Sequence, residues 1–229
     1  MVYSDFEKYA MSNGISSLSL NRFKNAMQNV QANIISPNIV EERTGNPLQM
    51  DVFSKLFTNR ILFLGTAIDS DVANIINSQL LYLQMDNKDK EVSLYINSPG
   101  GSVYDGLSIY DTMQFIDCPV HTTCIGLAAS MASVILAAGE NGHRQALKHS
   151  RILIHQPMSG IAPGSQASDI QIVNDEIQKL KCELFGILSE HSGQDYETMV
   201  KLGDRDCWLR ATEAKELGII DKVIEKEKK

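Results

Sequence analysis

The chain has 229 residues, of which 43% are hydrophobic and 21% charged, as expected of a folded globular protein with room for a substantial core. Its formal net charge of -7, without a dense run of lysine and arginine, argues against nucleic acid as a partner. The charged first eight residues resemble no secretory signal, and no apolar run is long enough to cross a bilayer, so we expect a cytoplasmic protein with no membrane partner.

The N-terminal part of the chain is polar and interrupted by turn-forming residues, as in Ser36-Pro37-Asn38. We interpret residues 1–45 as a loosely attached segment that precedes a domain spanning residues 46–229. Docking of this segment onto a partner and its removal by processing both fit the composition.

From residue 51 onward, short apolar runs alternate with segments in which apolar residues recur every three or four positions. The first kind predicts buried strands and the second predicts helices. Strands are expected at residues 60–65, 91–97, 120–125 and 151–155, and helices at residues 51–60, 70–85, 101–116 and 130–138. This alternation predicts an α/β fold with a parallel sheet built from repeated β-α crossovers.

The pattern changes after residue 155. Residues 156–166 are rich in Gly, Pro and Ser and predict an extended loop or an exposed hairpin. A helix over residues 167–191 would be about 36 Å long, more than one small sheet can cover, so we expect part of it to project into a partner subunit. The remaining residues predict helices at 196–202 and 211–217 and strands at 207–209 and 219–224.

Ser130 lies at the start of a predicted helix, in a turn that follows a strand. Binding sites of α/β sheets collect at such turns, and a helix N-terminus favours negative charge, so the hydroxyl is a candidate nucleophile. An N-cap hydroxyl is the alternative, because serine is common at that position. Ser133, one turn later, is interpreted as a helix hydroxyl that bonds a carbonyl one turn back. The flanking Ala128 and Ala132 do not match the G-x-S-x-G pattern of α/β-hydrolases.

A serine nucleophile needs a base and an acid that orients it. Of five histidines, His155 is the most suggestive, because it ends the apolar run Ile152-Leu153-Ile154 and is followed shortly by a proline. Asp204 and Asp206, beside a predicted strand, are two candidates for the acid. Position alone leaves surface or capping roles open for each histidine.

Four segments resemble the proteolytic subunit family of the ATP-dependent Clp protease. They are YINSPGGSVYDGLSIYDTMQFI, AASM, SRILIHQP and GDRDCWLRATEAKELGIID, in this order, within a likeness that covers residues 51–225. The resemblance implies an α/β fold of the ClpP/crotonase-like type, with repeated β-β-α units. It also implies a protruding helix and strand, the handle, at about residues 156–192.

The same resemblance implies a role for each site residue. The nucleophile falls on Ser130, the general base on His155 and the acid on Asp206. The oxyanion would be bound by the backbone amides of Gly101 and Met131. Asp204 and Arg205 match a charged pair at the contact between two rings.

The activity implied is that of a serine endopeptidase which hydrolyses unfolded proteins in protein quality control. The family's assembly is a homo-oligomer of two stacked heptameric rings, and its partner is an AAA+ unfoldase such as ClpX, ClpA or ClpC. No metal or cofactor is implied, since ATP is used by the unfoldase, and the four cysteines form no C-x-x-C pair.

Some positions depart from the family pattern. Leu127 stands where Gln is usual, Ala132 where Gly is usual, and the loop between Pro157 and Asp169 is about two residues longer. The first forty residues have no clear counterpart. Two other interpretations remain: a crotonase-like enzyme that binds a thioester enolate through two amides, and a non-catalytic ring subunit of the same family.

Overall fold

The structure, a computed structural model, describes residues 38–43 and 46–225, and side chains from residue 50 onward. The chain divides between Lys55 and Leu56 into two compact units. The predicted boundary at residue 45 stays a prediction, because residues 1–37 and 44–45 lie outside the described residues.

In the first unit, β1 (Asn38–Arg43) and β2 (Asn46–Asp51) pair antiparallel, with Asn38 opposite Asp51. Helix α3 (Val52–Thr58) follows directly. Neither strand was predicted, because Pro47 and the charged residues of β1 conceal any alternation of apolar and polar residues. The Asp51 side chain accepts a hydrogen bond from Ser54 N at 3.1 Å, and this cap begins α3.

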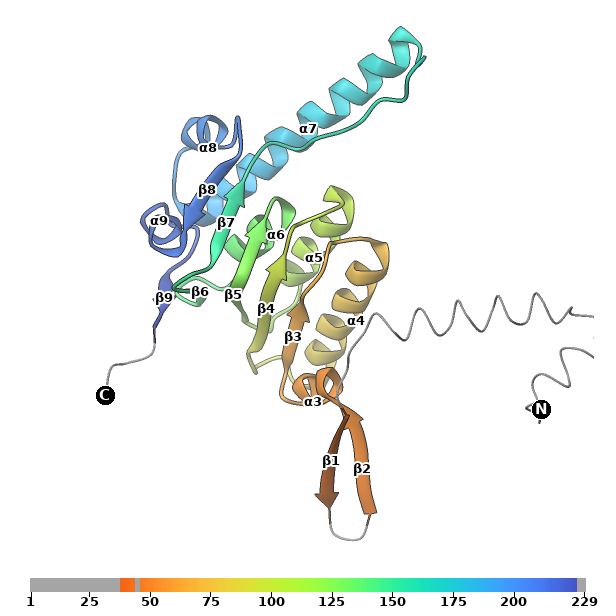
Figure 1. Cartoon of the computed structure of the whole chain (residues 1–229), viewed down its shortest axis with the longest axis vertical. Coiled ribbons are helices and arrows are strands. Elements are labelled where there is room, and N and C mark those ends of the chain that lie inside the picture. The colour runs from red at the N-terminus through yellow and green to blue at the C-terminus, as the bar shows by residue number, and fades with distance from the viewer. Residues whose placement is uncertain (1–37, 44–45, 226–229) are drawn as a thin grey trace, which may run out of the picture. The chain divides into compact units, whose positions relative to one another are not determined.

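The second unit is built on a seven-stranded sheet in which β3, β4, β5, β6 and β9 lie side by side in that order. The strands are β3 (Ile61–Leu64), β4 (Val92–Ser98), β5 (Val120–Ala129), β6 (Arg144–Leu147), β7 (Arg151–Ile154), β8 (Cys207–Arg210) and β9 (Lys222–Ile224). The first half of β5 pairs with β6 and its second half with β7. Figure 1 shows β7 and β8 continuing the sheet beyond the end of β6.

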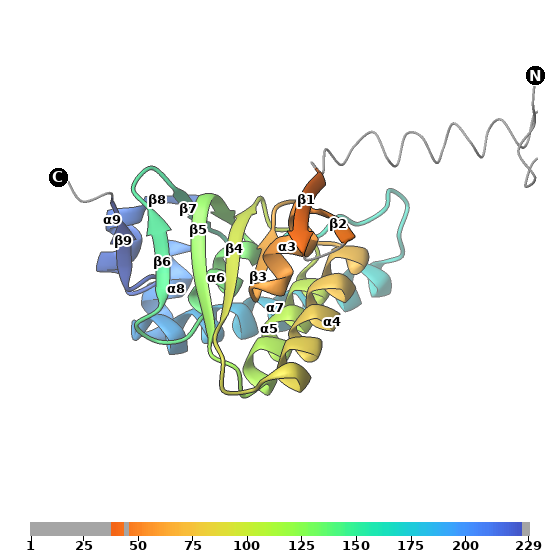
Figure 2. The same ribbon diagram turned by 90° about the horizontal axis from the view of Figure 1, so that it is seen from below.

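Six helices accompany this sheet: α4 (Ser70–Asp86), α5 (Val103–Phe115), α6 (Met131–Ala137), α7 (Ala167–Ser192), α8 (Tyr196–Leu202) and α9 (Ala211–Glu216). Neighbouring helices pack in the order α4, α5, α6, α7, and Figure 2 shows α4 and α5 together on one face of the sheet. Side chains of Asp69 and Ser102 cap α4 and α5 by accepting bonds from backbone amides. These helices and the sheet confirm the α/β fold.

Several predicted elements differ in extent or direction. Strand β5 continues to Ala129 instead of ending at residue 125, because its second half gains β7 as a partner. Strand β6 was missed, since its only two apolar residues, Ala146 and Leu147, are adjacent and give no alternating strand signal. The sheet is not wholly parallel, because β8 runs antiparallel to β7. The last strand is shorter than expected and begins at Lys222.

Helix α7 confirms the long helix predicted for this region, with 26 residues. Its buried side chains all lie near its C-terminal end: Leu184, Phe185, Ile187 and Leu188. The N-terminal half projects past the sheet (Figure 1), and Ile170 and Ile172 there are exposed. None of the helices in the described part of the chain is long and apolar enough to cross a membrane.

Candidate active site

The site forms where β4 and β5 end side by side. The pairing of these parallel strands shifts between Ile96 opposite Cys124 and Ser98 opposite Ala128, so β5 bulges by two residues just before its end. The Asn97 side chain fills the bulge, and its Oδ1 accepts a hydrogen bond from Leu127 N at 3.1 Å. The turns that follow the two strands are thereby brought together.

Gly100 is the point of contact between these turns. Its φ is +84°, and a Cβ at this position would lie 2.5 Å from Ala129 O and 2.8 Å from Ser130 Cβ. The same atom would lie 3.0 Å from Met131 N. Only glycine therefore allows the backbone after β4 to approach the serine turn this closely.

Ser130 has a backbone conformation that is unusual for a non-glycine residue, with φ 55° and ψ -126°. Its N–H donates to Leu153 O at 2.9 Å, which ties the turn to β7. Although it occupies the N-cap position of α6, its hydroxyl makes no capping hydrogen bond, so the N-cap alternative is wrong. Ser133 behaves as predicted: its hydroxyl donates to Ser130 O at 2.7 Å.

Two backbone amides next to Ser130, those of Gly101 and Met131, are the oxyanion donors that the family resemblance implies. Ile68 N donates to Gly100 O at 2.9 Å, and because N–H and C=O of a trans peptide point in opposite directions, Gly101 N–H points away from Ile68. Met131 is the first residue of α6, so its N–H is one of the donors that a helix leaves unpaired. Both amides adjoin the Gly100 contact.

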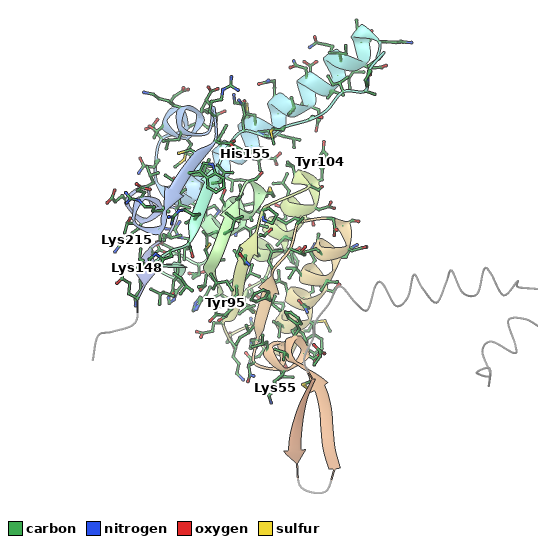
Figure 3. The ribbon with its side chains drawn as sticks, viewed as in Figure 1. Lys55, Tyr95, Tyr104, Lys148, His155 and Lys215 are labelled. Carbon is green, nitrogen blue, oxygen red and sulfur yellow. The ribbon has the colours of Figure 1, made fainter. Side chains whose placement is uncertain are left out.

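His155 follows β7, and Asp206 precedes β8. Because Ile154 pairs with Cys207 in this antiparallel ladder, the two residues continue opposite each other beyond the strands. His155 Nδ1 lies 3.1 Å from Asp206 Oδ1. In the neutral imidazole, the tautomer with Nδ1–H can donate to this carboxylate, and its Nε2 then presents a lone pair. Figure 3 shows His155 where α7 meets the sheet.

Ser130 and His155 line one small pocket with Met131 and Pro157. Its remaining walls are largely apolar side chains of α5, α6, β7 and α7: Val103, Val134, Ile154, Leu184, Phe185 and Leu188. His155 also lines a neighbouring pocket with Asp206. His155 therefore lines both pockets, one shared with Ser130 and the other with Asp206.

Asp204 and Arg205 lie on the exposed turn before β8 and line the pocket that contains Asp206. Within residues 50–225, neither side chain forms an ion pair. Their role at a contact between rings stays a prediction.

Asn97 and Gln156 support the site, although neither was predicted to have a role in it. Gln156 Nε2 donates to Asp204 O at 2.8 Å, in the turn that carries Asp206. Gly106 was missed as well: a Cβ there would lie 2.1 Å from Met131 Cγ, so the glycine lets α5 approach α6. A glycine inside a helix that is otherwise well formed was the available signal.

Comparison with known proteins supports a peptidase. Residues 43–227 match the family described as Clp protease. The chain is 51% identical over 227 residues to an ATP-dependent Clp protease proteolytic subunit of Porphyromonas gingivalis, which covers 99% of this chain and all of the relative. A subunit of the same name from Bacteroides fragilis is 53% identical over 221 residues, 96% of this chain and 98% of the relative. Proteolytic subunit 1 of Prochlorococcus marinus is 50% identical over 190 residues, 83% of this chain and 96% of the relative.

With the α/β fold, these similarities define the chain as a peptidase of the serine type. The chain belongs to the Clp protease family. Membership of this family decides against the crotonase-like alternative.

Proposed function

We propose that this chain is the proteolytic subunit of an ATP-dependent Clp protease and that Ser130, His155 and Asp206 are its catalytic triad. The observation that carries the assignment is the 3.1 Å contact between His155 Nδ1 and Asp206 Oδ1, with the imidazole and Ser130 lining one pocket. The positive φ of Ser130 is a further argument, because backbone strain of this kind collects at functional residues.

In the proposed mechanism, Ser130 Oγ attacks a peptide carbonyl carbon while His155 Nε2 accepts the hydroxyl proton. The negative oxygen of the tetrahedral intermediate accepts hydrogen bonds from Gly101 N–H and Met131 N–H. Asp206 holds the ring and stabilises the imidazolium, which then donates its proton to the leaving amine as the C–N bond breaks. Water, deprotonated by His155, releases the acyl group and restores Ser130.

The subunit needs neither metal nor cofactor for these steps, and ATP is used by the partner. We further propose a cytoplasmic homo-oligomer of two stacked heptameric rings, in which an AAA+ unfoldase such as ClpX, ClpA or ClpC delivers unfolded chains for quality control. The exposed apolar residues on the projecting half of α7 are available for contacts between rings, as are Asp204 and Arg205, which form no ion pair within residues 50–225.

Labelling with a serine-reactive fluorophosphonate tests the nucleophile. We expect one adduct, on Ser130, that is absent from Ser130→Ala and nearly absent from His155→Ala, whereas Ser133→Ala labels like the wild type. Hydrolysis of a small peptide amide should fall by at least about 10³-fold in the first two variants. An adduct on another serine would contradict the assignment.

Native mass spectrometry of the same sample separates the protease from a non-catalytic ring subunit. Fourteen subunits that label at Ser130 are expected. A fourteen-subunit ring without labelling would support the non-catalytic alternative, and a monomer at micromolar concentration would contradict the proposed assembly.

A further inference from the structure

The carboxylate of Asp206 is held less firmly by its surroundings than the imidazole it contacts. Its side chain is 63% exposed, whereas that of His155 is 12% exposed. Water competes for an exposed carboxylate, so the contact persists only if the backbone keeps both groups in place. The hydrogen bonds and packing that hold the turn at residues 203–206 therefore determine whether Asp206 Oδ1 stays in contact with His155 Nδ1.

Both ends of this turn are fixed. At the first end, the buried Gly203 donates its N–H to Met199 O at 3.0 Å. A Cβ on Gly203 would lie 2.4 Å from the ring of Phe185, so the backbone packs tightly against α7. At the other end, Cys207 pairs with Ile154 in the sheet. The three residues between them are all exposed.

Gln156 holds the turn between these two ends. Its backbone N–H donates to Gly203 O at 2.8 Å, and its side-chain Nε2 donates to Asp204 O, also at 2.8 Å. The second bond fixes the backbone two residues before Asp206. Gln156 directly follows His155. The same short segment therefore carries the imidazole and forms the hydrogen bonds that hold the turn of Asp206.

We propose that Gln156 is a positioning residue for peptide hydrolysis: its amide keeps the Asp206 carboxylate at His155 Nδ1. This inference rests on the proposed function. Without the Nε2 donor, the turn from Asp204 to Asp206 loosens and water takes the place of the carboxylate at Nδ1. The ring then loses its fixed orientation, and the imidazolium loses the charge that stabilises it.

The test replaces Gln156 with methionine, which keeps the length of the side chain and removes its donor. Steady-state hydrolysis of a small peptide amide is measured from pH 5 to 9, with active sites counted by fluorophosphonate labelling. We expect kcat per active site to fall about tenfold with little change in KM, since the substrate loses no contact. The fraction of subunits that label should stay at the wild-type value, because the site remains folded and only the orientation of the imidazole is lost.

Gln114→Met is the matched control. Gln114 Nε2 also donates to a backbone carbonyl, Ala138 O at 3.0 Å, but at the far end of α6 from Ser130. Gln114→Met should leave kcat and KM unchanged. Both variants are compared in the oligomeric state that native mass spectrometry finds for the wild type.

Wild-type kcat in Gln156→Met, or a lower kcat accompanied by a raised KM or a loss of labelled subunits, would overturn the positioning role. This failure is distinct from failure of the proposed function, in which Ser130→Ala would keep its activity and label.

Discussion

At the scale of single residues, the site depends on positions where the backbone comes unusually close to its neighbours. The positive φ of Ser130 and the close approach of Gly100 depend on each other, because the turn that carries Ser130 packs directly against the turn that carries Gly100. Asn97 supports this contact from the strand side through its bond to Leu127 N. The three side chains of a triad are therefore not sufficient to form the site, because the backbone turns around them must also pack closely against each other.

Gly100→Ala tests this fit. The added methyl group would meet Ala129 O at 2.5 Å, so the turn must move and carry the Gly101 amide with it. We expect kcat/KM for a peptide amide to fall by at least about 100-fold, the size of effect seen when one oxyanion donor is lost.

Gly142→Ala is the control for backbone strain alone. Gly142 has φ +85°, close to the +84° of Gly100, but a Cβ there would meet nothing within 4 Å. This variant should lose about 1 kcal/mol of unfolding free energy and keep full activity. Equal activities of the two variants would show that the close approach at Gly100 is unimportant.

At the scale of elements, an ion pair between the buried Arg144 and the partly buried Asp221 joins β6 to the chain before β9. Arg144 donates to Asp221 from Nε at 2.9 Å and from Nη2 at 2.5 Å, and also donates to His191 O at the end of α7. Burial raises the pKa of Asp221, but the hydrogen bonds and charge of Arg144 outweigh it, so this pKa lies below its usual value. The short strands β6 and β9 are thus fixed by charge as well as by backbone pairing.

Asp221→Asn should lower the free energy of unfolding by about 3 kcal/mol, because the Arg144 side chain, 6% exposed, would keep an uncompensated charge. Urea denaturation measures this loss. Glu225→Gln, which breaks the exposed pair with Lys148, is the control and should cost less than about 1 kcal/mol. Similar losses of unfolding free energy in Asp221→Asn and Glu225→Gln would contradict the expectation that burial makes the first ion pair the more important one for stability.

At the scale of the whole molecule, histidines make stability depend on pH. The rings of His121 and His143 are stacked, with centroids 4.0 Å apart. Burial and the neighbouring His143 lower the pKa of His121, against smaller opposing effects of Glu91 and Glu140. Burial lowers the pKa of His191 as well, with Arg144 acting in the same direction and Glu190 against it.

A lowered pKa in the folded state means that the unfolded chain binds more protons as the pH falls. The free energy of unfolding should therefore be fully retained above about pH 6.5, the ordinary value for histidine, and decrease below it. Urea denaturation at pH 7.5 and 5.5, at one protein concentration, measures the difference. His121→Gln should reduce it, whereas His149→Gln, at an exposed position, should not. If the free energy of unfolding of His121→Gln changed between pH 7.5 and 5.5 as much as that of the wild type, His121 would not be a source of the pH dependence.

The sequence by itself determined the α/β alternation, the long helix and the family resemblance, because apolar periodicity and contiguous motifs are local properties of the chain. It did not determine the end of β5, the existence of β6 or the direction of β8, since each depends on a strand distant in sequence. The Ser130 hydroxyl illustrates the same limit: an N-cap and a free hydroxyl have the same local sequence. Only tertiary structure separates them, because the contacts of Gly100 and Leu153 set the backbone of Ser130, and the pairing of β7 with β8 brings Asp206 to His155.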